Sequence, residues 1–324
     1  MVSAVTVHKT GGPEVLTFET VDVAKPGRGE IRIRQGACGV NFIDVYFRNG
    51  YYKAPTMPFI AGSEGAGEIV AVGEGVSDLK VGDRVGYAMG LGGYAEERIL
   101  AADRAVKLPD AISDEQAGAM MLKGMTACYL LRRTYKVEKG NTILVHAAAG
   151  GVGLLLCQWA KHIGATVIGT VGSKEKAELA RANGCDHPIL YRDEDFAARV
   201  KDITNGKLCH VVYDGIGKAT YPGSVDCLRP FGMFVNFGAA SGAIKDFDLN
   251  SLAPKGSLFA TRPTLGTHIA KREDLLELAH GLFDVVASGA VKIEINQKYP
   301  LKDAGQAHRD LEGRKTTGTT ILVP

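Results

Sequence analysis

The sequence predicts an α/β protein with two domains, and three observations support this fold class. The chain has 324 residues, about twice the size of a common domain. Its first third is rich in short β-type runs separated by glycines. From residue 141 to about residue 260, strand-like and helix-like segments alternate, which predicts βαβ units and a parallel sheet. We therefore expect a β-rich domain and a doubly wound domain with a six-stranded parallel sheet.

The β-rich domain is predicted from runs of β-type residues at 30–34, 67–72 and 94–100. At residue 113 the pattern changes, because Ser113 and Gln116 have the spacing of a capping box that begins a long helix. We expect this helix to connect the two domains.

The doubly wound domain is predicted from the segments that follow. Helices are expected from 174 to 183, where Gly184 ends the pattern, and from 195 to 204. Strands are expected at 141–145, 165–171, 187–191, 210–213, 232–237 and 257–261.

The tail contains an amphipathic helix at 272–288, then a strand, a short helix and a terminal strand at 319–323. This segment is too small to fold comfortably alone, so we assign it to the β-rich domain. The predicted domains are therefore 1–122, completed by 262–324, and 123–261.

Composition excludes several classes of protein. The 38 basic and 36 acidic residues give a net charge of +2 and form no basic stripe, so we expect no nucleic-acid partner. No apolar run approaches the ~18 residues of a membrane span, and residues 1–9 do not resemble a signal peptide, so we expect a cytoplasmic protein. The six cysteines include no C-x-x-C pair, which favours small buried residues, although a reactive thiol stays open.

A glycine-rich turn, His146-Ala-Ala-Ala-Gly-Gly-Val-Gly153, lies between a predicted strand and a predicted helix. Gly150, Gly151 and Gly153 allow a sharp bend, and a helix N-terminus attracts a pyrophosphate. The usual first glycine of the dinucleotide motif is Ala148 here, so an ordinary glycine-rich turn remains an alternative. We expect His146 to be a hydrogen-bonded strand residue and leave it out of the catalytic set.

The end of the next predicted strand indicates which dinucleotide binds. NAD-preferring sites place an acid there for the ribose 2′-hydroxyl, whereas this chain has Gly172 and Ser173, followed by Lys176. We expect Glu175 to point away from the face of Lys176. The hydroxyl and the ammonium suit a 2′-phosphate, which predicts NADPH. The alternative is that the lysines at this helix start are merely solvated.

Six segments, in this order, are similar to those of a known family: Gly39–Tyr46, Gly62–Gly67, Val81–Val85, Leu122–Thr126, His146–Gly153 and Gly172–Lys176. The chain resembles, over essentially its whole length, the NADPH-dependent quinone oxidoreductases of the medium-chain dehydrogenase/reductase superfamily. The resemblance implies a GroES-like catalytic domain, a Rossmann domain and NADPH bound between them.

The resemblance also predicts an enzyme without a metal. Zinc-dependent alcohol dehydrogenases of the superfamily have a cysteine ligand where this chain has Asn41 and a histidine ligand where it has Ser63. Their four-cysteine lobe has no counterpart, because residues 86–98 contain no cysteine. Without a Lewis acid, hydride transfer needs an acceptor that is already electrophilic, such as a quinone or an enone.

By resemblance, the residues that face the nicotinamide and the substrate are Asn41, Asp44, Tyr46 and Tyr52. The spacing of Asn41 and Asp44 places them on one face of a helix. For the two tyrosines, ordinary packing aromatics are the alternative. The implied cofactor-binding residues are Asn41, Phe42, Tyr46, Leu130, Gly150, Gly151, Val152, Gly153, Gly172, Ser173, Lys176, Tyr191, Phe237, Gly238, Ser241, Arg262 and Arg314.

The leading hypothesis is an NADPH:quinone oxidoreductase, and an NADPH-dependent 2-alkenal or enone reductase is the alternative. Relatives that act as lens crystallins or bind RNA add a binding role, which the balanced charge does not favour. The apolar run at 257–261 lies where family members pair edge strands, so we expect a homodimer.

Overall fold

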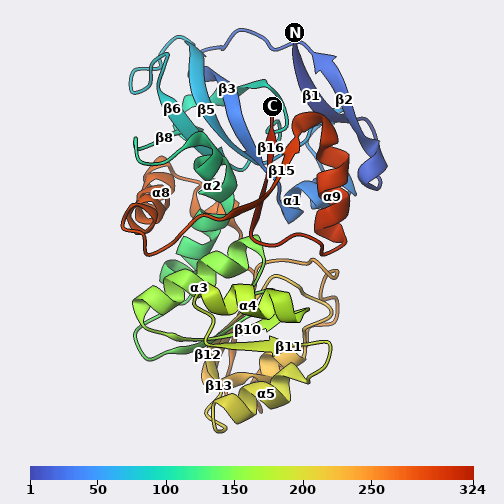
Figure 1. Ribbon diagram of the computed structural model, residues 1–324, viewed down its shortest axis with the longest axis vertical. Helices are drawn as coiled ribbons and strands as arrows, with labels where there is room; N and C mark the ends of the chain where they lie inside the picture. Colours follow the sequence, from blue (N-terminus) through green and yellow to red (C-terminus); the bar gives the residue numbers. More distant parts are fainter. The chain divides into compact units, whose positions relative to one another are not determined.

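The computed structural model describes residues 1–324, which divide into two compact units (Figure 1). The first unit comprises residues 1–125, 269–287 and 293–324, and the second comprises 126–268 and 288–292. The chain passes from one unit to the other after residues 125 and 268, a few residues beyond the predicted domain boundaries at 122 and 261. The short return at 288–292 is a feature that the sequence pattern did not predict.

The first unit contains two sheets. A three-stranded sheet has the order β2-β1-β4, with β1 (Val2–Val7), β2 (Leu16–Val21) and β4 (Phe59–Ile60). A seven-stranded sheet has the order β15-β16-β3-β5-β6-β8, with β7 also paired to β3. Its strands are β3 (Glu30–Gly39), β5 (Glu64–Val72), β6 (Arg84–Ala88), β7 (Glu97–Ala101), β8 (Val106–Lys107), β15 (Ile295–Pro300) and β16 (Thr319–Val323).

The C-terminal tail is part of this second sheet. Strand β16 pairs antiparallel with β3, and Ile321 lies opposite Gly39. Helix α9 (Ala304–Glu312) buries Ala304 and Ala307 in the core that covers β1. The tail therefore supplies both strand pairing and core to the first unit. The unit also contains α1 (Phe42–Arg48), α8 (Arg272–Ala287) and the short helices η1 (Pro13–Val15), η2 (Ala102–Arg104) and η5 (Leu301–Asp303).

Helix α2 (Asp114–Tyr129) carries the chain from the first unit into the second. Its predicted capping box is present: the backbone N–H of Ser113 donates to Gln116, and that of Gln116 donates to the Ser113 hydroxyl. After Tyr129 the backbone continues as a π-helical segment, η3 (Leu130–Thr134).

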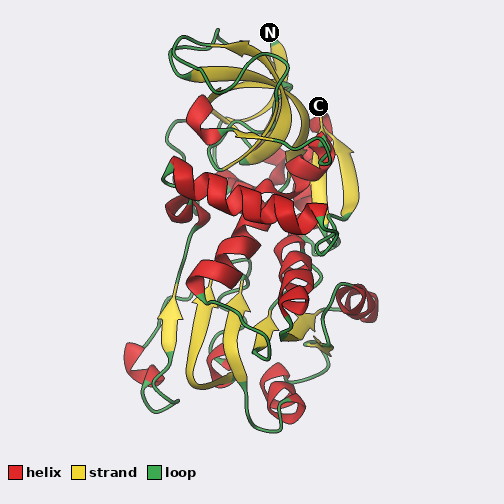
Figure 2. Ribbon diagram, turned by 90° about the vertical axis from the view of Figure 1, so that its left-hand side faces the viewer, coloured by secondary structure: helices red, strands yellow, loops and turns green.

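The second unit has the predicted six-stranded parallel sheet, in the order β11-β10-β9-β12-β13-β14. The order reverses between β9 and β12, where doubly wound sheets place ligands beyond the carboxyl ends of the strands. Helices lie to either side of these strands in Figure 2. The strands are β9 (Thr142–Val145), β10 (Thr166–Val171), β11 (His187–Leu190), β12 (Cys209–Asp214), β13 (Leu228–Asn236) and β14 (Phe259–Thr261), and the helices are α3 (Gly151–Ile163), α4 (Lys174–Ala182), α5 (Phe196–Ile203), α6 (Gly223–Asp226), η4 (Leu249–Leu252) and α7 (Leu265–His268).

The core explains the apolar sequence patterns. Ile143, Leu144 and Val145 of the central strand β9 are completely buried, as expected for a strand that is covered on both faces. All six cysteines are buried, and none forms a disulfide. No helix of the structure has the length and apolar character needed to cross a membrane.

Candidate functional site

The glycine turn lies directly after β9, at the reversal of strand order. Helix α3 begins at Gly151, and its N-cap, Gly150, provides no side-chain cap. The first-turn N–H groups of a helix have no partner within the helix, so they are available to an anion. A Cβ on Gly153 would overlap the carbonyl oxygen of Ala147 and lie 2.9 Å from Cα of Ala148. The turn therefore requires glycine at position 153 and fits a pyrophosphate.

His146 holds the start of this turn in place. Its Nδ1 lies 2.9 Å from Oγ1 of Thr170, and its Nε2 lies 2.9 Å from Oγ of Ser224. Ser224 in turn donates to the Asp214 carboxylate at 2.9 Å. Burial lowers the pKa of His146 and keeps the ring neutral. His146 is thus a buried, hydrogen-bonded residue that joins three strands and α6.

The residues predicted to select a 2′-phosphate lie near the carboxyl ends of β10 and β11. Ser173 is the N-cap of α4 and accepts a hydrogen bond from the backbone N–H of Lys176 at 3.3 Å. A Cβ on Gly172 would lie 3.0 Å from the Tyr191 hydroxyl. A hydrogen bond from Ser173 lowers the pKa of the Glu175 carboxyl. The side chains of Glu175 and Ser173 therefore lie close together.

Other predicted cofactor residues follow β12, β13 and β14. The N–H of Phe237 donates to the Asp214 carbonyl at 2.9 Å, and the Ser241 hydroxyl donates to the Ile216 carbonyl at 2.8 Å. Nη1 of Arg262 donates to the Asn236 carbonyl at 3.2 Å. These bonds tie together the loops at the carboxyl edge of the sheet.

Gly238 and two outlying residues, Leu130 and Arg314, also belong to the predicted cofactor-binding set. A Cβ on Gly238 would lie 2.5 Å from the Gly215 carbonyl oxygen, so the loops approach each other closely. Leu130 is fully buried, and its carbonyl accepts a hydrogen bond from the Tyr213 hydroxyl at 2.9 Å. Arg314 belongs to the first unit and follows α9 with a φ of +57°.

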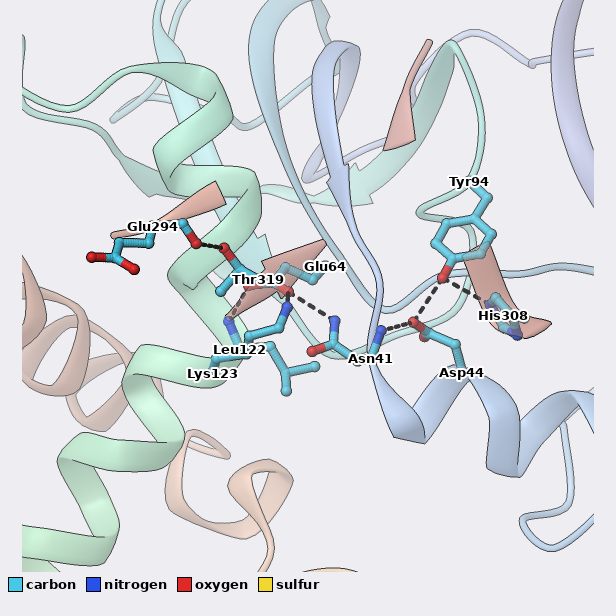
Figure 3. A network of polar contacts seen from close by, with 9 residues as sticks. All are labelled: Asn41, Asp44, Glu64, Tyr94, Leu122, Lys123, Glu294, His308 and Thr319. Atoms are coloured by element: carbon cyan, nitrogen blue, oxygen red, sulfur yellow. Dashed lines mark hydrogen bonds and ion pairs between the residues drawn. The ribbon is translucent and has the colours of Figure 1, made fainter. Parts of the chain in front are cut away.

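In the first unit, Asn41 and Glu64 form the centre of a buried polar cluster (Figure 3). Nδ2 of Asn41 donates to Oε2 of Glu64 at 2.8 Å, and Nζ of Lys123 donates to the same oxygen at 2.9 Å. The other oxygen, Oε1, accepts the N–H of Leu122 at 2.7 Å. The cluster fixes the amide of Asn41. Gly39 makes room for it, because a Cβ there would overlap the Glu64 carboxylate.

Glu64 and Lys123 were missing from the predicted site. Their side chains are 0% and 7% exposed, respectively, and they form an ion pair. The sequence contained one signal for them: each is a charged residue within an otherwise apolar or small-residue run.

Asp44 belongs to the first turn of α1. Asn41 is the N-cap, and its N–H donates to Oδ2 of Asp44 at 2.9 Å. The hydroxyl of Tyr94 donates to the same oxygen at 3.0 Å. Burial raises the pKa of Asp44 to about 6. Oδ1 of Asp44 and Oγ of Ser63 are both buried without a hydrogen-bond partner, although Ser63 is near enough to lower the pKa of the carboxyl.

The predicted tyrosines belong to an aromatic cluster on α1 and the turn after it. The ring of Tyr46 lies 5.2 Å from that of Tyr51, 5.3 Å from that of Tyr52 and 6.3 Å from that of Phe42. Phe47 and Tyr52 are 5.7 Å apart. The structure thus brings Asn41, Phe42, Tyr46 and Tyr52 together, while the carboxyl of Asp44 faces the buried Tyr94.

Comparisons with known proteins cover the whole chain. The model described as "Alcohol dehydrogenase GroES-like domain" matches residues 27–110, and "Zinc-binding dehydrogenase" matches residues 151–281. A quinone oxidoreductase from Pseudomonas aeruginosa is 52% identical over 97% of both chains. The crystal structure of an Escherichia coli quinone oxidoreductase complexed with NADPH is 48% identical and has a TM-score of 0.97 over 99% of this chain and 100% of that one.

This chain belongs to the quinone oxidoreductase family of medium-chain dehydrogenases/reductases. The family also includes a 2-haloacrylate reductase from Burkholderia sp., which is 44% identical over 100% of this chain and 99% of that protein. Family membership confirms the predicted fold class, a GroES-like domain with a Rossmann domain.

Within this family fold, the residues at the zinc-ligand positions do not fit a zinc ion. Zinc prefers thiolate, imidazole and carboxylate ligands. Asn41 instead uses its amide N–H₂ to donate to Glu64, and position 63 has a hydroxyl. The ammonium of Lys123 already neutralises the Glu64 carboxylate. Among the 324 described residues, no group of three or more His, Cys, Asp and Glu side chains is placed to hold a metal ion.

Proposed function

We propose that this protein is an NADPH:quinone oxidoreductase that works without zinc. The observation that carries the proposal is the polar cluster at Asn41. Asn41 and Ser63 stand at the positions where the resemblance places the cysteine and histidine ligands of zinc-dependent relatives, and Asn41 instead donates to a Glu64 carboxylate that Lys123 neutralises. Without a Lewis acid to polarise an alcohol or a simple ketone, the acceptor must be electrophilic by itself, as a quinone is.

The glycine turn and the start of α4 support NADPH as the cofactor. The N–H groups of Gly151, Val152 and Gly153 would hold the pyrophosphate, and Ser173 and Lys176 would hold the 2′-phosphate. When bound, the reduced nicotinamide supplies the hydride. The similar Escherichia coli enzyme was crystallised with NADPH.

The residues at the start of α1 would orient the acceptor. The fixed amide of Asn41 leaves its Oδ1 on the side away from Glu64, and the rings of Tyr46 and Tyr52 suit contact with a flat acceptor. Two-electron reduction of a quinone takes one hydride from the cofactor and one proton from solvent, and it yields a hydroquinone. The remaining predicted site residues belong to the proposal as cofactor contacts.

Steady-state kinetics with NADPH and NADH against a panel of quinones, enones and simple alcohols test this function. We expect NADPH-dependent quinone reduction, no alcohol oxidation and unchanged rates after treatment with a chelator. Activity that requires stoichiometric zinc would overturn the proposal. Equal efficiencies with NADPH and NADH would remove the cofactor assignment alone.

An NADPH-dependent 2-alkenal or enone reductase is the second candidate function. The 2-haloacrylate reductase at 44% identity favours it, because an acrylate has a carbon–carbon double bond conjugated to a carbonyl group. The same kinetic panel decides between the two: kcat/KM for enones above that for quinones would favour the second candidate.

We also propose that the protein is a cytoplasmic homodimer. Strand β14 pairs only with β13, so its other edge is open, and all three of its residues are exposed. Phe259 on this strand is 56% exposed, and an open apolar edge is a surface that a second copy would cover. A monomeric mass at micromolar concentration in sedimentation experiments would contradict the dimer. Six buried cysteines that form no disulfide suit a reducing compartment, which cell fractionation tests.

A further inference from the structure

A buried line of hydrogen bonds crosses the first unit from α9 to α1. The Glu312 carboxylate accepts two hydrogen bonds from Arg48, each of 2.9 Å. Nη1 of Arg48 also lies 3.1 Å from Nδ1 of His308. Nε2 of His308 lies 3.1 Å from the Tyr94 hydroxyl, which lies 3.0 Å from Oδ2 of Asp44. Except for Glu312, every member is at most 1% exposed.

The direction of each bond in this line follows from its donors. A guanidinium only donates, so Nδ1 of His308 accepts from Arg48. Burial, and secondarily the charge of Arg48, lower the pKa of His308 to about 3, which leaves one ring proton at neutral pH. That proton is therefore on Nε2 and is donated to Tyr94. The hydroxyl hydrogen of Tyr94 is then available only to the Asp44 carboxylate.

Hydrogen bonds are the main support of the Asp44 carboxylate, because its charged neighbours already have partners. Arg48 on α1 is paired with Glu312, and Lys123 on α2 is paired with Glu64. The thiol of Cys38 on β3 is neutral, since burial raises its pKa to about 12. The other neighbours of Asp44 are the hydroxyls of Ser63 and Tyr94, and beyond Tyr94 the neutral ring of His308.

Asp44 in turn fixes the beginning of α1. Its Oδ2 accepts the N–H of Asn41, while its own N–H donates to the Asn41 carbonyl at 3.1 Å. We propose that His308 is a positioning residue: through Tyr94 it holds the Asp44 carboxylate, and thereby the turn that places Asn41 and Tyr46 for the reaction. This inference deepens the proposed function and rests on it for the role of Asn41.

Two substitutions of His308 separate its hydrogen bonds from its shape. In the wild type, the rings of Tyr94 and His308 pack edge-on, with centroids 5.8 Å apart and an interplanar angle of 87°. His308→Phe keeps a ring at this place but removes both nitrogens. His308→Gln keeps one acceptor and one donor and loses the ring. Tyr94→Phe removes the next link. Gln306→Ala changes an exposed residue of the same helix and is the matched control.

The first measurement does not depend on activity. Hydrogen–deuterium exchange reports on the N–H groups of residues 41–48. We expect faster exchange there in His308→Phe and Tyr94→Phe, near-normal exchange in His308→Gln, and no change in Gln306→Ala. Wild-type exchange in His308→Phe would overturn the proposal, and if that variant fails to fold, Tyr94→Phe and His308→Gln decide the same question.

The second measurement is the pH profile of NADPH-dependent quinone reduction. We expect His308→Phe to lower kcat by about 10-fold to 100-fold, as displaced site residues do. Tyr94→Phe removes a bond to the charged form of Asp44, so the acid limb moves to higher pH.

A double variant tests whether His308 acts through Tyr94. His308→Phe should add nothing to Tyr94→Phe, whereas multiplied effects would mean that His308 acts by another route and would overturn the proposal. The proposed function and the positioning role of His308 are tested by different outcomes. A wild type that reduces no quinone removes the proposed function, while exchange still tests the positioning; normal quinone reduction and normal exchange in His308→Phe remove the positioning alone.

Discussion

The carbonyl oxygen of Ala147 occupies the space that a Cβ on Gly153 would need. Gly153→Ala must therefore push the turn away from the start of α3. We expect the variant to lose about 1–3 kcal/mol of stability, as overpacked sites do, and at least about tenfold in affinity for NADPH. Fluorescence titration with NADPH measures the affinity. Gly150→Ala is the comparison within the same turn, because its Cβ would meet the same oxygen at 3.2 Å, a tight contact that needs only a small shift, so we expect a smaller loss; an equal loss in both variants would contradict the explanation.

Glu64→Gln tests the cluster around Asn41. The substitution leaves the ammonium of Lys123 buried without its counter-charge, which costs roughly 3–5 kcal/mol in similar cases. Urea unfolding measures this loss. The double variant Glu64→Gln/Lys123→Met has no unpaired charge and should recover much of the stability. A double variant less stable than Glu64→Gln would show that the charge pairing is not the cause.

Asp44→Asn should change stability in a pH-dependent way. The folded pKa of Asp44 is raised to about 6, whereas an unfolded aspartate titrates near ~3.9, so the folded state binds more protons between these values. The wild type therefore loses stability as pH rises from ~4 to ~6, by up to about 3 kcal/mol at 1.36 kcal/mol per unit.

The amide that replaces the Asp44 carboxyl is neutral at every pH, so the variant does not undergo this loss. We expect the free energy of unfolding of Asp44→Asn, taken relative to that of the wild type, to be greater at pH 7.5 than at pH 4. Urea midpoints at the two pH values give the comparison. The same difference at both values would mean that the Asp44 carboxyl has an ordinary pKa.

Lys176→Asp should reverse the choice of cofactor. An acid at the start of α4 repels a 2′-phosphate and accepts a hydrogen bond from a 2′-hydroxyl. We expect the ratio of kcat/KM for NADPH to that for NADH to fall by about 10-fold to 100-fold. Lys174→Asp, two residues earlier, is the control for a general effect of charge. An equal fall in both variants would mean that these lysines are merely solvated residues at the start of a helix.

Local patterns predicted the parts of this fold that depend on neighbouring residues. The six parallel strands, the capping box at Ser113 and the glycine turn each follow from short segments whose periodicity or turn residues have one favoured structure. The segment after Gly39 was expected to be helical, and Asn41 proved to be its cap rather than its first residue.

Contacts between distant polar residues were not predictable in the same way. Glu64 and Lys123 are 59 positions apart, and Arg48 and His308 are 260 positions apart. No local period marks such pairs, because tertiary packing alone brings them together. The assignment of residues 288–292 to the second unit escaped prediction for the same reason.

The pairing of β16 with β3 has a consequence for synthesis on the ribosome. Residues 30–39 emerge early, whereas their neighbours at 319–323 leave the exit tunnel almost 300 residues later. The second unit is complete once residue 292 has emerged, so it is able to fold while the first unit still lacks a strand and helix α9. Strand β3 is thus made long before its neighbour β16, and a nascent chain exposes an unfinished sheet until residue 323 has emerged.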